Sequence, residues 1–502
     1  MRRILILWCM ILLTACGVSK SSFSPGRKFS PEQLQRDYDL YRNILEHHHP
    51  GLYWYTPKDS IDYYFDYGRR QLNDSLTEPA FRKILSFVTA KINCGHTSIR
   101  NSKAWAKYSD TVRAGKMFPL SMKLWNDTML VTANLNRRDS ILRRGTMITK
   151  VNGKTIPELT DTLFRYISSD GYNLTHKYQS LSNRGYFGSL YTSIFGPKEK
   201  YDLEYIDSTG KPAKITIPVY NPAADTAGRM TIRQPARIPM PSKKERKRQQ
   251  ISTIRLLRID TVNHSAMMTL STFGKGYALR KFFRQSFRAV KENHITHLIV
   301  DVRGNGGGNV NNSTLLTRFI ANQPFRTGDS LYAVNKRSPY YKYIQNHFWN
   351  RLFIGFFTRK KKDGLYHFGY FERHSFKPKR SNHFDGKTYI VTGGNSFSAT
   401  TLFTSALIRQ ENVIVVGEET GGGAYGNSAW LIPDVTLPET GVRFRLPLFR
   451  LVIDKNRVKD GLGVQPEIFS FPSISAIKRN ADFKIEKVME LIKEDQAKNK
   501  NP

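Results

Sequence analysis

From Ser265 onward, apolar segments of strand length alternate with amphipathic segments of helix length. Strands are expected at 267–273 and 295–302, with a helix between them near 278–292. A further strand is expected at 388–392, followed by a turn and a helical apolar run. Such alternation predicts an α/β core.

The remaining sequence divides around this core. With 502 residues, several cores or one large core with appendages are expected. Ser30-Pro31-Glu32-Gln33 is typical of a helix start, and the apolar spacing that follows is helical. The predicted parts are a helical subdomain at 30–115, a β-rich domain at 116–222, a basic linker or exposed insertion at 223–262, the α/β core at 263–475 with an aromatic, basic surface insertion at 326–384 that packs on itself, and a charged C-terminal helix at 476–502.

The N-terminus has the features of an export signal. Arg2 and Arg3 precede the apolar run 4–15, which is too short to span a membrane. Leu13-Thr14-Ala15-Cys16-Gly17 resembles the bacterial lipobox, in which the cysteine is acylated. We therefore expect a signal peptide at 1–16, lipid attachment at Cys16 and a tether at 17–29. The alternative is an ordinary secretory signal with an accidental cysteine.

The chain is strongly basic. Its 78 lysine and arginine residues against 41 acidic residues give a net charge of +37, which favours phosphate-rich or anionic-lipid partners. The basic run 243–248 lacks interleaved aromatic residues, so a solvated loop is a better interpretation than a nucleic-acid arm. The three cysteines, Cys9, Cys16 and Cys94, exclude a disulfide framework and a four-cysteine zinc site.

A glycine-rich loop, Gly304-Asn305-Gly306-Gly307-Gly308, follows the strand that ends near Asp301. It lacks the third glycine of a dinucleotide loop and the Gly-Lys-Ser/Thr ending of a phosphate loop, so nucleotide binding is disfavoured. Two interpretations remain: an oxyanion hole built from backbone N–H groups, or a flexible turn.

Ser396 and Ser398 lie in the turn between the strand at 388–392 and the following helix. A serine at the first turn of a helix lies near the positive end of the helix dipole, and the N–H of Ala399 is unpaired there. These properties favour a nucleophile, but a helix cap is an equally simple role.

Histidine is the usual base for a serine hydroxyl, and Asn93-Cys94-Gly95-His96-Thr97 offers His96. His96 could also be satisfied within a core. A thiol nucleophile at Cys94 is disfavoured, because side chains two positions apart point in different directions. His47-His48-His49 lacks ligand spacing, so no metal site is expected.

Together these segments resemble peptidase family S41, the C-terminal processing or tail-specific proteases and their tricorn-like relatives. The resemblance covers roughly 30–470 and rests on ordered motifs: Cys94 to Thr97, Leu298 to Gly308, Asn395 to Ala399, Val415 to Gly423 and Gly461 to Glu467. It implies a ClpP/crotonase-like catalytic domain, a PDZ-like module at 116–222 and hydrolysis of peptide bonds.

The resemblance also implies roles for individual residues. Ser398 corresponds to the nucleophile, and Ala399 with Gly306 or Gly307 to the oxyanion hole. The lysine base of the processing-protease branch is absent from Thr420-Gly421-Gly422-Gly423. The chain therefore resembles the branch with a Ser-His-acid arrangement, in which His96 is the base and Asp460 orients it.

The sequence thus predicts a serine endopeptidase that cleaves proteins or peptides in the bacterial cell envelope and needs no cofactor. We expect a lipid anchor at the outer membrane, facing the periplasm, an anionic envelope surface as a further partner, and no nucleic-acid partner. The alternative is a catalytically inactive S41-like lipoprotein that binds peptides, lipids or polyanions.

Overall fold

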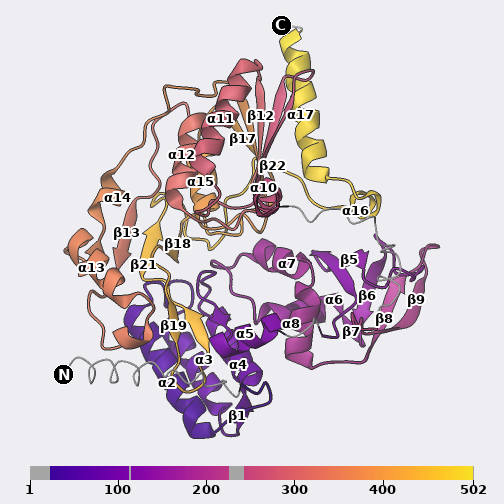
Figure 1. Cartoon of the computed structure of the whole chain (residues 1–502), viewed down its shortest axis with the longest axis vertical. Coiled ribbons are helices and arrows are strands. Elements are labelled where there is room, and N and C mark those ends of the chain that lie inside the picture. The colour runs from indigo at the N-terminus through magenta and orange to yellow at the C-terminus, as the bar shows by residue number, and fades with distance from the viewer. Residues whose placement is uncertain (1–22, 112–114, 225–241, 501–502) are drawn as a thin grey trace, which may run out of the picture.

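The structure, a computed structural model, describes residues 23–111, 115–224 and 242–500. The predicted signal peptide with Cys16, and the first part of the predicted tether, lie outside these residues. Figure 1 shows a helical N-terminal part, a β-rich part inserted after it, and a larger body of sheet and helices. The predicted α/β fold class, with its helical subdomain and β-rich insertion, is confirmed. Within the described ranges, no helix is both long and apolar enough to cross a bilayer.

The N-terminal part begins with the predicted helix. Ser30 and Gln33 form a capping box, with Pro31 at the first helical position. The expected apolar face of this helix, including Tyr38 and Tyr41, is fully buried. The elements are β1 (Lys28–Phe29), α2 (Pro31–His48), α3 (Lys58–Arg70), β2 (Leu76–Thr77), α4 (Glu78–Ala90), β3 (Ile99–Arg100) and α5 (Lys103–Thr111).

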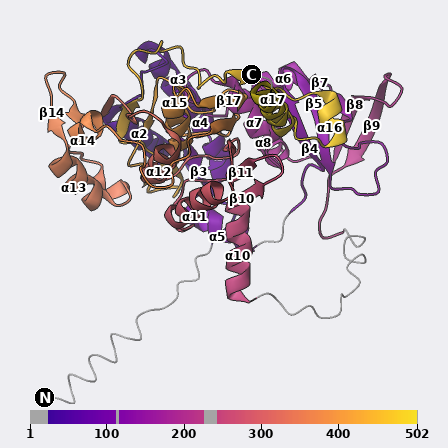
Figure 2. The ribbon, with the colours of Figure 1, turned by 90° about the horizontal axis from the view of Figure 1, so that it is seen from above.

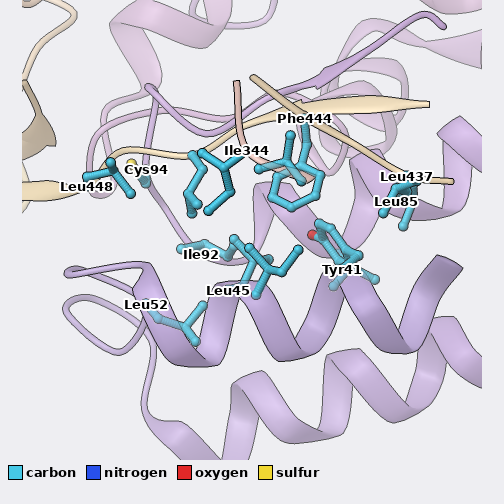
Figure 3. Packing of buried hydrophobic residues seen from close by; sticks show 14 of the residues in the cluster. Tyr41, Leu45, Leu52, Leu85, Ile92, Cys94, Ile344, Leu437, Phe444 and Leu448 are labelled. Carbon is cyan, nitrogen blue, oxygen red and sulfur yellow. The ribbon is translucent and has the colours of Figure 1, made fainter. Parts of the chain in front are cut away.

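The core of this part includes residues from distant sequence. Figure 3 shows Tyr41 and Leu45 packed beneath Ile344 and Phe444. In addition, β20 (Arg443–Arg445) pairs with β3 and with β19 (Asp434–Thr436). The segment between α4 and β3 contains His96. Side-chain packing and strand pairing therefore both hold this segment against the larger body.

The inserted part is an antiparallel sheet with strand order β4-β5-β6-β8-β9, covered by helices. Asn152 and Gly153 both have positive φ in the tight turn between β6 and β7, as the Asn-Gly signal predicts. Whether the module is PDZ-like stays a prediction. Its elements are β4 (Leu120–Trp125), β5 (Thr128–Asn134), β6 (Met147–Val151), β7 (Lys154–Thr155), α6 (Ile156–Phe164), α7 (Leu174–Ser182), α8 (Tyr186–Phe195), β8 (Lys200–Ile206) and β9 (Pro212–Pro218).

The predicted basic linker or exposed insertion at 223–262 is wrong at 255–260, which form a core strand, and the basic run 243–248 is helical rather than the expected loop. A capping box of Ser242 and Glu245 starts α10 (Lys243–Ile254), which projects from the body in Figure 2. The strand β10 (Arg255–Asp260) then pairs with β11 (Ser265–Leu270). Leu257 and Ile259 pack against the core, so β10 belongs to the α/β body.

The central sheet has the order β10-β11-β12-β16-β17-β22, and all its neighbouring strands except β10 and β11 are parallel. Because β12 and β16 are parallel neighbours, the glycine loop and the serine turn leave the sheet at the same edge. Helices from the sequence between the strands cover one face. These elements are α11 (Leu279–Glu292), β12 (His297–Asp301), α12 (Val310–Ile320), β16 (Lys387–Thr392), α15 (Ala399–Leu407), β17 (Val413–Gly417) and β22 (Ile468–Phe469).

The C-terminal helices, α16 (Ile474–Arg479) and α17 (Phe483–Lys500), include the predicted charged helix, but α17 is also a structural layer. Val488 and Ile492 pack on the second face of the central sheet. Lys484 is buried, pairs with Glu418 at 2.6 Å and donates to the carbonyl of Thr392 at 2.8 Å. The carboxyl end of β16 is therefore tied to α17.

The segment 326–384 is not a self-packed surface insertion, so that prediction is wrong. Its strand β13 pairs with β21, and Leu331 and Ile354 are buried in the core of the N-terminal helices. The elements of this second sheet and its helices are β13 (Ser330–Ala333), a 3₁₀ turn (Tyr341–Tyr343), α13 (His347–Phe357), β14 (Arg359–Lys360), β15 (Tyr366–His367), α14 (Gly369–Arg373), β18 (Gly426–Ala429) and β21 (Phe449–Val452).

Two buried histidines at the end of α2 make stability depend on pH. Burial lowers the pKa of His49 to about 3 and that of His48 to about 4, from 6.5. As pH falls below 6.5, the unfolded chain takes up protons that the folded chain does not, so the free energy of unfolding decreases. We expect each histidine to contribute a slope of about 1.4 kcal/mol per pH unit. Denaturant unfolding at a series of pH values should show a shallower slope for His49→Gln; an unchanged slope would contradict this.

Candidate active site

Ser398 lies between β16 and α15 in a backbone conformation that L-residues rarely adopt. Its φ is 58° and its ψ is −119°, and its side chain does not cap α15. Among the described residues, its hydroxyl has no hydrogen-bond partner. Such strain costs about 1–3 kcal/mol and is typical of active sites. Ser398 therefore does not have the helix-cap role that was the alternative interpretation of this serine.

Ser396 has a structural role instead. It is fully buried, donates to the carbonyl of Val302 at 2.8 Å and accepts from the N–H of Gly393 at 3.2 Å. These bonds tie the serine turn to the end of β12.

The glycine loop lies directly against the serine turn. Gly307 has φ +96°, and a Cβ at this position would be 2.7 Å from the carbonyl oxygen of Phe397 and 2.7 Å from the Cβ of Ser398. Only glycine permits this approach.

The predicted oxyanion donors change at one position. The N–H of Gly307 donates to Asn305 Oδ1 at 2.9 Å. The prediction that Gly307 supplies a free N–H to the oxyanion hole is therefore wrong. Ala399 retains the unpaired N–H of a helix start. Gly308 lines the cavity beside Ser398, whereas Gly306 does not, and the role of Gly306 stays a prediction.

Substitution in the glycine loop should separate activity from stability. We expect Gly307→Ala to lower the peptidase rate about 100-fold, because displacing reacting groups by about 1 Å has an effect of this order. Gly304→Ala is the matched control, since a Cβ at Gly304 meets nothing within 4 Å. Initial rates and melting curves of both variants test this. Equal rates for the two variants would show that the close approach is not needed.

His96 lies beside the serine turn. Its ring centroid is 4.7 Å from that of Phe397, the residue before Ser398. Both ring nitrogens are buried, and neither has a hydrogen-bond partner among the described residues. The structure thus places His96 against the residue that precedes the predicted nucleophile, and no hydrogen bond joins His96 to Ser398. Catalytic hydrogen bonds are often long before substrate binds.

The acid next to His96 is Asp170, not Asp460. Asp170 Oδ1 lies 3.7 Å from His96 Nδ1, and the N–H groups of Gly95 and Gly423 donate to its carboxylate. Burial raises the pKa of Asp170, but His96 and these N–H groups outweigh burial and hold it below its ordinary value.

The prediction of Asp460 as the orienting acid is wrong. Asp460 is exposed and accepts from the N–H of Leu462 at 2.9 Å. The neighbouring Gly461 contacts Tyr172 through its backbone, with 2.9 Å between the Tyr172 nitrogen and the Gly461 oxygen. The backbone of Gly461, and not the side chain of Asp460, therefore lies against the segment that contains Asp170.

A second histidine, which the sequence did not indicate, comes from the inserted part. His176 on α7 has Nδ1 2.8 Å from the carbonyl oxygen of Gly394. Its ring is 5.2 Å from Phe397, so Phe397 contacts both histidines. Burial lowers the pKa of His176. The inserted part thus contributes Asp170 and His176 to the surroundings of the serine turn.

A cavity of about 390 Å³ opens beside Ser398. Trp430 and Leu431, which form part of its wall, have φ of 61° and 25°. The apolar wall is made of Val310, Leu402, Ala429, Trp430, Leu431, Ile432 and Leu451. The cavity can accommodate an apolar side chain next to the serine hydroxyl.

The other candidates do not form a site. Burial raises the pKa of Cys94 to about 11, so its thiol is not activated. His47 lies 3.2 Å from the carbonyl of Arg337, whereas His49 lies 2.7 Å from the hydroxyl of Thr97. In the part of the chain that the structure describes, no group of three His, Cys, Asp or Glu residues could hold a metal ion.

Comparison with known proteins identifies the domain that carries Ser398. Residues 264–469 match the model of peptidase family S41. The chain contains a peptidase domain of family S41. The S41 domain includes the glycine loop and the serine turn, whereas His96 and Asp170 precede the matched range. The predicted class, a serine peptidase of this family, is confirmed, and no curated protein matches the sequence.

Two solved structures of CPAF are similar to this chain in fold. A structure of mature CPAF has 13% identity and a TM-score of 0.61, covering 92% of this chain and 97% of its own. Mature CPAF complexed with lactacystin has the same identity and TM-score, with 92% and 98% covered. The photosystem II D1 C-terminal processing protease has 11% identity and a TM-score of 0.39, with 89% and 96% covered. At 13% identity, the similarity to CPAF shows a shared fold alone.

Proposed function

We propose that this chain is a serine endopeptidase in which Ser398 is the nucleophile, His96 the general base and Asp170 the residue that orients His96. The observation that carries the proposal is the position of Ser398, which lines a cavity beside the glycine loop of the S41 domain. Its backbone is strained and its side chain does not cap α15. Asp170 and His96 complete the arrangement from two other parts of the chain.

In the first step, Ser398 Oγ attacks the scissile carbonyl carbon, and its proton passes to His96 Nε2. The carbonyl electron pair moves onto oxygen, and the N–H groups of Ala399 and Gly308 stabilise the resulting charge. Asp170 stabilises the imidazolium through Nδ1. For this step, His96 must close the gap to Ser398 when substrate binds.

The intermediate then collapses and the peptide C–N bond breaks. His96 returns its proton to the leaving amine, and the acyl group stays on Ser398 as an ester. Water attacks this ester while His96 takes its proton. The ester C–O bond then breaks, His96 returns the proton to Ser398 Oγ, and the new carboxyl group is released.

We place this activity on proteins or peptides in the bacterial cell envelope. The lipobox-like segment ending at Cys16 supports a lipid anchor, and the outer membrane facing the periplasm is the proposed location. The net charge of +37 supports an anionic surface as a further partner.

The unpaired nitrogens of His96 favour a second candidate, an inactive S41-like protein that binds peptides, lipids or polyanions. A fluorophosphonate probe separates the two, because it reacts with activated serines. The peptidase proposal expects labelling that Ser398→Ala abolishes and Ser405→Ala, on the same helix, preserves. Lactacystin, the ligand of one CPAF structure, is a suitable competitor. Folded wild-type protein without labelling would favour the binding protein.

A further inference from the structure

Five large aromatic side chains are exposed at one end of the molecule. Their exposed fractions range from 58% to 79%, although side chains of this size are usually mostly buried. We call them the aromatic patch: Phe348, Trp349, Phe356, Phe357 and Tyr370. Figures 1 and 2 place α13 and α14 on the side opposite the inserted part, and Figure 2 shows β14 on the same side.

The base beneath the patch is well packed. On α13, Ile354 and Asn350 are buried, while the four patch residues of this helix are exposed. The ring of Phe353 lies 5.4 Å from that of Phe368. The exposed side chains are therefore displayed by a folded element that keeps its own apolar face in the core.

Basic side chains surround the patch. The segment 326–384 has thirteen lysine and arginine residues and three acidic residues. Arg359, Lys360 and Lys362 are exposed in or beside β14, and none of the three forms a salt bridge with the described residues.

The three acidic residues of this segment already pair with basic side chains of the same segment. Asp329 pairs with Arg326, Asp363 lies 2.8 Å from His367, and Glu372 pairs with Lys361 and His367. No carboxylate among them is left to offset the basic side chains around the patch.

We propose that the aromatic patch and its basic rim bind the headgroup region of an anionic lipid bilayer. Trp, Tyr and Phe with flanking Lys and Arg are the composition that proteins use at membrane interfaces. Each basic residue near such a surface adds attraction to anionic lipids. The rings stand out on a helix face, whereas single-stranded nucleic acid is bound in grooves that track its backbone.

The patch is connected to the cavity beside Ser398. Phe368 lies 6.4 Å from Phe357 of the patch and 6.4 Å from Trp430, which lines that cavity. Phe371 lies 5.1 Å from Trp430. Docking of the patch would therefore hold one wall of the cavity close to the bilayer surface.

The test uses the full chain with Cys16→Ser in every protein, so that the predicted acylation site does not contribute. Binding is measured by co-sedimentation with phosphatidylcholine vesicles, with and without phosphatidylglycerol. One variant combines Trp349→Ser, Phe356→Ser and Phe357→Ser; another combines Arg359→Gln, Lys360→Gln and Lys362→Gln. The matched charge control is Lys244→Gln, Lys247→Gln and Arg248→Gln on α10, a surface without the patch.

We expect binding only to vesicles with phosphatidylglycerol, weakened on the order of 100-fold by the rim variant and at least about tenfold by the aromatic variant. The α10 control should bind as the parent does. Hydrogen exchange should slow over 347–373 when these vesicles are added. Equal binding by all variants, or exchange that does not change there, would overturn the proposal. So would self-association that the aromatic variant abolishes without vesicle binding, since the patch would then be an interface between copies.

Discussion

Replacing Ser398 by alanine is expected to reduce kcat on casein or a peptide substrate by on the order of 10⁴-fold to 10⁶-fold. The variant loses the only atom that forms the acyl-enzyme, while backbone N–H groups still bind the substrate carbonyl. Since the hydroxyl has no partner among the described residues, the melting temperature should change little. Initial rates with purified protein measure the effect.

Ser396→Ala is the informative control for this prediction. It removes the hydrogen bonds to Val302 and Gly393, so we expect a loss of about 1–3 kcal/mol in the free energy of unfolding. A rate loss comparable to that of Ser398→Ala, at a temperature where Ser396→Ala is folded, would argue against the assignment of roles.

Replacing Asp170 by asparagine is expected to lower kcat by about 10³-fold to 10⁴-fold. Asparagine can still accept from Gly95 or Gly423, but it cannot stabilise the charged form of His96. KM should change much less, because Asp170 acts through His96. The pH dependence of kcat/KM should also shift, which a purely structural role would not produce.

Asp460→Asn is the matched control for Asp170→Asn. Its carboxylate is exposed and bonds only to the nearby backbone, so its rate should stay within a fewfold of the parent. A large rate loss in Asp460→Asn with near-normal Asp170→Asn would restore the sequence-based choice of acid.

The resemblance to family S41 predicted that the glycine loop and the serine turn lie together, and the strand pairing explains why. Each follows a strongly apolar strand, and the carboxyl ends of parallel strands meet at one edge. The apolar spacing of α2 was equally clear because helical periodicity is strong over 18 residues.

Asp170 could not be found in this way. It lies in a short polar segment between α6 and α7, where no periodicity or spacing distinguishes one carboxylate from another. Its importance arises from the contact of this segment with Gly95 and Gly423, which are far away in sequence. The resemblance to family S41 directed attention to Asp460, which is exposed in the structure.

The insertion at 326–384 was misread for a related reason. Aromatic and basic residues occur together there, and the sequence does not show which rings face the core and which face solvent. The pairing of β13 with β21 and the burial of Ile354 on α13 fix the inward side and leave the aromatic patch outside.

The most direct test of the central claim is to trap the acyl-enzyme. Rapid acid quenching during turnover of an activated ester, followed by peptide mass mapping, locates the acyl group on the chain. We predict that the acyl group is attached to Ser398 and that it accumulates far more slowly in His96→Ala. Product formation with the acyl group on another residue, or with no acylated peptide at all while wild-type protein turns over, would contradict the account.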